Sequence, residues 1–243
     1  MKASITRTVF NREFWAAFYS PARYLTFTAL FGFSAAILAA SVQFAQGQFW
    51  TLQALWLFSV AIPLPLFVTM VTMPLIAGER ASGTFEAMML LPIPLRKIVI
   101  GKFLAAFLAI CLGLLGTVVP WFLLVHTLGS RSQVSPEVLR APYCILLLQA
   151  FSWTALGMLS SAVSRRPWIA AAGTLLSGIA LMLLWGALAQ FFLAENHHAP
   201  LFPIWDELLF AANGHIALHS IVFHLSFGLW CLFMAIHLLE ARR

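Results

Sequence analysis

The chain has 243 residues, of which 62% are hydrophobic and 9% are charged, and its mean hydropathy is +0.92. Ordinary soluble domains carry about 25% charged residues, and a soluble chain of this length could not cover so much apolar surface with polar groups. The composition therefore excludes a soluble enzyme and a secreted disulfide scaffold. The net charge of +6 lies in short clusters between long uncharged stretches, which is typical of membrane topology and not of nucleic-acid binding.

Six apolar stretches are long enough to cross a hydrocarbon core, which takes about 20 helical residues. They cover residues 24–44, 52–77, 98–126, 142–163, 168–193 and 215–239, and none contains Asp, Glu or Arg. Pro63, Pro65 and Pro74 in the second stretch and Pro120 in the third predict kinks. We expect an all-α polytopic membrane protein with six transmembrane helices, in a single transmembrane domain over residues 1–243.

The segment before the first span has its own pattern. Apolar residues recur at three- and four-residue spacing from Ile5 to Phe18, while Arg7 and Arg12 lie largely elsewhere on the helical wheel. This predicts an amphipathic helix over residues 1–21 in the cytoplasmic interface, the alternative being a polar lead-in to the first span. The first apolar run is longer than a signal-peptide core and begins late, so we expect it to be retained.

The lysines and arginines predict the orientation. Twelve of the 14 basic residues fall in the N-terminal segment, the loop between spans 2 and 3 with its flank, the loop between spans 4 and 5, and the C-terminal segment. Only Arg131 and Arg140 lie on the other side. By the positive-inside rule both termini are cytoplasmic. On the outer side, Pro203, the acids Asp206 and Glu207, and Gly214 predict a short interfacial or re-entrant helix near residues 203–213.

Three histidines suggest a rival function. His215 and His219 share a helix face, and His224 follows in the last span, so a haem- or metal-handling membrane protein is an alternative. No His-Glu-x-x-His pattern accompanies them, so we favour interfacial or packing roles. Cys111, Cys144 and Cys231 lie inside apolar runs and are interpreted as small hydrophobic residues.

Small residues at four-residue steps predict close helix packing, within the subunit or with a second copy. They are Gly32, Ala36 and Ala40 in span 1, Gly157 and Ser161 in span 4, and Ala170, Thr174 and Gly178 in span 5.

The cytoplasmic connection over residues 78–97 is rich in charge. Ser82, Gly83 and Thr84 break the second span and can cap a new helix that begins near Phe85 and ends before Pro92. With Met88 and Met89, this short helix is either a docking surface for a partner or a folded link between two spans.

The same segment resembles the signature of type-2 ABC transporter permeases. The matching string is Glu79-Arg-x-x-Gly83-Thr84-Phe-Glu86-x-Met-x-x-x-Pro92-Ile-Pro94-x-x-x-Ile98-Val-x-Gly101-Lys102, within a resemblance strongest over residues 74–107. Residues 155–164 are similar to the end of span 4 in this family. The compact form, without a large outer domain, looks most like the gliding-motility-associated branch.

The resemblance implies the membrane-spanning permease subunit of an ATP-driven transporter, usually an exporter, in the bacterial inner membrane. A second permease, identical or not, would pair with it. A separate cytoplasmic ATPase, which holds ATP and Mg²⁺, would dock on the segment 78–97 and on the N-terminal helix. The chain itself is expected to be non-catalytic and without a cofactor, since Gly101-Lys102 lacks the rest of a P-loop. The expected ATPase-coupling residues are Glu79, Arg80, Gly83, Thr84, Phe85, Glu86, Met88 and Met89.

A third alternative is an ABC assembly that relays force to an outer partner and does not transport. An accessory membrane or periplasmic chain would then supply the outer surface that the short outer loops lack.

Overall fold

The computed structural model describes residues 5–19, 21–44, 49–90, 94–127, 139–192 and 203–241. Within these ranges the ordered elements are helices, as the predicted fold class requires. In chain order they are α1 (Ile5–Tyr19), α2 (Pro21–Phe44), α3 (Phe49–Ala61), α4 (Leu64–Thr72), α5 (Ala77–Ala81), α6 (Thr84–Met89), α7 (Leu95–Gly116), α8 (Val118–Thr127), α9 (Arg140–Val163), α10 (Pro167–Phe192), α11 (Pro203–Ala212) and α12 (Leu218–Glu240).

Five stretches of the described helices are long and apolar enough to cross a membrane. They are Gln53–Thr72, Leu95–Phe122, Arg140–Val163, Pro167–Leu184 and Leu218–Glu240, and they correspond to predicted spans 2 to 6. The first predicted span corresponds to α2, whose apolar stretch Tyr24–Ala40 is shorter than the other five. The structure therefore supports a multi-pass membrane protein, while a sixth crossing stays a prediction.

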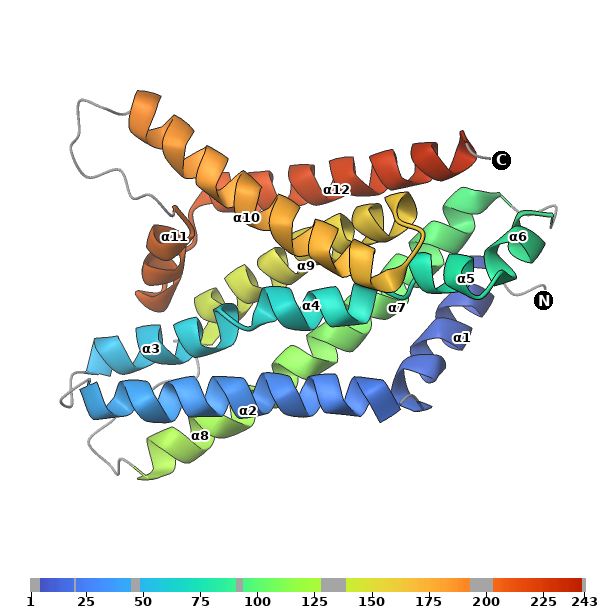
Figure 1. Ribbon diagram of the computed structural model, residues 1–243. Helices are drawn as coiled ribbons and strands as arrows, with labels where there is room; N and C mark the ends of the chain where they lie inside the picture. The colour runs from blue at the N-terminus through green and yellow to red at the C-terminus, as the bar shows by residue number, and fades with distance from the viewer. Residues whose placement is uncertain are drawn as a thin grey trace.

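The long helices form one bundle in which α9 lies between α4, α7, α10 and α12 (Figure 1). The short helices α5 and α6 lie at one end of the bundle, where α1 begins and α12 ends. We call this the α6 end. The helix α11 lies across the opposite end, which we call the α11 end. The start of α1 and the end of α12 thus lie at the same end of the bundle, while the predicted orientation of the termini stays a prediction.

Prolines break the second and third spans where the sequence predicts kinks. The helix α3 ends before Pro63, and α4 ends before Pro74. The α7–α8 break lies at Thr117, because Pro120 has no N–H to donate to the carbonyl of Gly116. Since unpaired backbone groups are costly inside a membrane, such breaks need side-chain partners.

Ser161 of α9 supplies partners at the break after α4. Its Oγ accepts the backbone N–H groups of Ile76 and Ala77 at 3.1 and 3.0 Å and donates to the carbonyl of Met73 at 3.1 Å. One hydroxyl therefore satisfies three backbone groups between α4 and α5. The start of the charged segment is fixed to the central helix in this way.

Close packing against α9 confirms part of the small-residue prediction. A Cβ at Gly157 would overlap the side chain of Thr72 on α4, and one at Gly178 on α10 would overlap the ring of Trp153. Gly157 and Gly178 therefore permit the close approach of α4 and α10 to α9. A Cβ at Gly32 would meet no atom within 4 Å, so the small residue at this position of α2 does not serve close packing against another described helix of the chain.

The two predicted peripheral helices are both present as helices. On α1, Val9, Phe10 and Phe14 are half-buried while Arg7 and Arg12 are exposed, but a position in the membrane interface stays a prediction. The helix α11 matches the segment predicted near residues 203–213, and Gly214 ends it with a left-handed φ of 83°. This geometry favours glycine, as the predicted helix stop assumed.

Candidate coupling site

The segment between the second and third spans folds as two short helices joined at Gly83. This residue has a φ of 74°, in the left-handed region that glycine adopts without strain. The hydroxyls of Ser82 and Thr84 donate to the carbonyl of Glu79 at 3.1 and 3.2 Å, so they close the end of α5 and leave the first turn of α6 uncapped. The predicted break at residues 82–84 is therefore present, and its hydroxyls act on the preceding helix.

Glu79 points inward, onto a buried lysine. The Nζ atom of Lys102 on α7 lies 2.8 Å from the Oε1 atom of Glu79 on α5 and 2.8 Å from the Oε1 atom of Glu13 on α1. The Lys102 side chain is 3% exposed, and the two carboxylates are 13% and 16% exposed. Arg12 approaches both carboxylates to 3.5 Å from the solvent side. We call these four residues the Lys102 cluster.

Arg80 and Phe85 hold α5 and α6 against the bundle. The guanidinium of Arg80 lies 4.6 Å from the ring centroid of Phe85, and its Nη1 donates to the carbonyl of Ser164 at 3.3 Å. Phe85 is buried in the hydrophobic core. Since Ser164 directly follows α9, the pair anchors the segment on the central helix.

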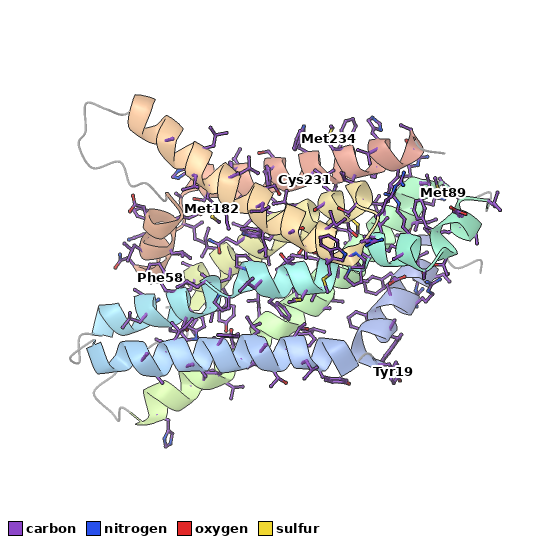
Figure 2. All side chains as sticks on the ribbon, in the orientation of Figure 1. Tyr19, Phe58, Met89, Met182, Cys231 and Met234 are labelled. Atoms are coloured by element: carbon purple, nitrogen blue, oxygen red, sulfur yellow. The ribbon has the colours of Figure 1, made fainter. Side chains whose placement is uncertain are left out.

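The outward face of the segment is smaller than the sequence suggested. Glu86 is exposed, together with Gly83 and Thr84, whereas Met88 and Met89 are half-buried and pack against the core. Figure 2 places Met89 at the α6 end of the bundle. Leu90, which directly follows α6, is 86% exposed.

Three members of the Lys102 cluster, Arg12, Glu13 and Lys102, were not among the predicted site residues. Lys102 carried a usable signal, because no other Asp, Glu, Lys or Arg occurs in the predicted spans, and a charge at that depth requires partners. The sequence held no comparable signal for Glu13, because it is 89 residues away from Lys102 along the chain and lies in a segment assigned to the membrane interface.

The histidines of the rival interpretation differ in their exposure. His215 and His219 are exposed, whereas His224 is buried. Among the described residues no three His, Cys, Asp or Glu side chains come together in a way that could hold a metal ion. The observed partners of His224 are the hydroxyl of Ser152 on α9, 2.7 Å from Nδ1, and the carboxylate of Glu207 on α11, 3.4 Å from Nε2. We call these three residues the His224 cluster.

Glu207 belongs to the outer helix and was not among the predicted site residues. Burial opposes its ionised form, but hydrogen bonds from His224 and Ser220 and the charges of His224 and His219 outweigh burial and lower the pKa of Glu207. An ionised carboxylate only accepts hydrogen bonds, so Nε2 of His224 must carry a proton in this contact. The cluster joins α9, α11 and α12 at the α11 end.

Long apolar helices that break near prolines, with a charged pair of short helices at one end of the bundle, define a polytopic membrane protein. A family model described as ABC-2 family transporter protein matches residues 8–237, so the chain belongs to that family of type-2 ABC transporter permeases. None of the curated proteins compared with the chain matches it. The chain is therefore a membrane permease component of an ABC transporter, a class that works in the bilayer with a partner ATPase.

Proposed function

We propose that the chain is the membrane-spanning permease subunit of an ATP-driven exporter in a bacterial inner membrane, and that its ATPase docks on α5 and α6. The observation that carries the proposal is the division of this segment into two faces. Arg80 and Phe85 fix it to the core, while Glu86 and Leu90 remain exposed beside them. A firmly anchored segment with an exposed outer face can transmit the movement of a bound partner to the spans.

The distribution of charge supports a cytoplasmic α6 end. Arg7 on α1, Arg96 and Lys97 at the start of α7, and Arg165 and Arg166 between α9 and α10 are all exposed, and these elements meet at the α6 end. Basic residues concentrate on the cytoplasmic side of membrane proteins. An ATPase that finds its nucleotide in the cytoplasm could therefore reach α5 and α6.

Pairing with a second permease subunit is part of the proposal. The spans in α10 and α12 leave most of their apolar side chains exposed in the single chain, including Leu176, Ile179, Leu229 and Phe233. Lipid or a second subunit can cover such surfaces. The ATPase subunits would hold ATP and Mg²⁺, and this chain would supply the pathway and the coupling joint. The assignment to the gliding-motility-associated branch also belongs to this proposal.

Charge reversal at Glu86 tests the docking assignment. In vesicles that contain the permease and the ATPase that co-purifies with it, we expect Glu86→Lys to lower permease-dependent ATP hydrolysis by about tenfold, the effect of about 1.4 kcal/mol at the interface. The insertion and the yield of the permease should not change, because Glu86 is exposed. Glu240→Lys is the matched control, since Glu240 is an exposed carboxylate at the same end but outside α5 and α6. Equal hydrolysis by both variants would contradict the proposal.

A further inference from the structure

The Lys102 cluster connects three helices through one ammonium group. Lys102 lies in the first turns of α7, Glu13 in the middle of α1 and Glu79 in the middle of α5. The contacts are equal at 2.8 Å, the length of a charge-assisted hydrogen bond. The same atom of Lys102 therefore holds the N-terminal helix and the helix that leads into the coupling segment.

The charges of this cluster do not balance inside the protein. One buried ammonium faces two carboxylates, and the balancing guanidinium of Arg12 is 75% exposed. The Oε2 atom of Glu79 is buried and has no hydrogen-bond partner among the described residues. Lys102 is thus the only buried counter-charge in the cluster, and without it two partly buried carboxylates would face each other.

Close packing beside the cluster restricts how α1 can move. A Cβ at Gly101, next to Lys102, would lie 3.0 Å from the carbonyl oxygen of Thr6 and 3.1 Å from Val9 on α1. The backbones of α1 and α7 are therefore in close contact immediately beside the ammonium. Lys102 lies where this close-packed helix pair meets the carboxylate of α5.

We propose that Lys102 is a positioning residue of the coupling machinery, which binds Glu13 and Glu79 at once and makes α1, α5 and α7 move as one unit. The inference rests on the proposed function, because it concerns the displacement that a docked ATPase imposes on α5 and α6. Through Lys102 that displacement reaches α1 and the third span together. Glu79 acts through Lys102 inside the permease and does not contact the partner.

The first test uses the permease alone, in lipid nanodiscs. Spin labels at the exposed positions Thr8 on α1 and Ala87 on α6, with Cys111, Cys144 and Cys231 replaced by alanine, report the distance between the two helices. We expect one narrow distance distribution for the otherwise unchanged chain and for the control Lys97→Met, an exposed lysine on the same helix. Glu13→Gln and Lys102→Met should broaden the distribution, and Lys102→Arg should restore it. A distribution unchanged in both Glu13→Gln and Lys102→Met overturns the proposal.

The second test adds the co-purifying ATPase, with and without Mg-ATP and vanadate. We expect the Thr8–Ala87 distance to stay constant between the two states in the unchanged chain, while a second pair, Ala87 with Met234 on α12, shifts. In Glu13→Gln the Thr8–Ala87 distance should shift as well, by more than the width of the unchanged chain's distribution. A constant distance in Glu13→Gln with the ATPase bound overturns the positioning role. Failure of any ATPase to bind overturns the proposed function instead, and the first test still decides whether Lys102 joins the helices.

Discussion

The two ends of the bundle are each joined by a buried polar cluster, but the chemistry of the clusters differs. At the α6 end, opposite full charges meet at 2.8 Å around the ammonium of Lys102. At the α11 end, an imidazole lies 2.7 Å from a hydroxyl and 3.4 Å from a carboxylate. Each cluster connects three helices. The comparison teaches that buried helices can be joined either by an ion cluster or by an imidazole placed between a hydroxyl and a carboxylate.

The difference predicts unequal costs of removing one member. Removing one partner of a buried ion pair costs about 3–5 kcal/mol, because a charge is left without compensation. Leaving a buried hydrogen-bonding group without its partner costs about 1–3 kcal/mol. The α6 end should therefore be the more sensitive of the two to single substitutions at its centre.

The largest effect is expected for Lys102→Met, which leaves the carboxylates of Glu13 and Glu79 without their buried counter-charge. We expect it to lower the free energy of unfolding by about 3–5 kcal/mol, measured by thermal or denaturant unfolding in detergent. Neutralising both carboxylates in the same chain, with Glu13→Gln and Glu79→Gln, should recover most of the loss. If the triple variant is as unstable as Lys102→Met, packing and not charge explains the cost.

A smaller effect is expected for His224→Leu at the α11 end. The substitution removes the partner shared by Ser152 and Glu207, so we expect a loss of about 1–3 kcal/mol in the same unfolding experiment. His219→Leu is the matched control, because His219 is an exposed histidine of the same helix. A loss for His224→Leu larger than that for Lys102→Met would reverse the comparison.

The smallest effect is the response of α11 to acid. The pKa of Glu207 is lowered from its ordinary value of 4.5. The stabilisation that the ionised carboxylate gives the folded protein is therefore complete above pH 4.5 and is lost as the pH falls through the lowered pKa. We expect a spin label at the exposed residue Leu209 to become more mobile over this range.

Substitution of Glu207 by Gln should remove that response. The label at Leu209 should then show the same mobility at neutral and acid pH, whereas Asp206→Asn, on the same helix, should leave the response intact. An acid response that persists in Glu207→Gln would assign it to another group.

Local rules predicted much of the fold. The proline breaks, the Gly83 turn and the Gly214 stop all follow from backbone geometry that these residues impose on their neighbours. The sequence did not indicate which span is central. The central helix α9 has the lowest mean hydropathy of the five spans and is nevertheless well buried, and its Ser152 and Ser161 hydrogen-bond to groups outside α9. In contrast, α12 has a hydropathy of 1.9 with 22% buried.

The site was predictable only in outline. The segment 78–97 could be identified from its charge and its turn residues, but the direction of each side chain could not. Glu79 pairs with Lys102, 23 residues away, and Glu207 pairs with His224, 17 residues away, across helix breaks that hydropathy does not describe. The absence of carboxylates from the predicted spans gave no signal for Glu207, because α11 brings this carboxylate to α12 from outside the spans.

A photo-crosslinking amino acid at position 86 tests the central claim most directly. Incorporated there and irradiated in native membranes, it should form a covalent product with a single protein that mass spectrometry identifies as an ATPase with a P-loop. The same amino acid at exposed Asn213, at the α11 end, should not yield that product. Products at position 86 that contain only lipid or a protein from the outer side of the membrane would contradict the account.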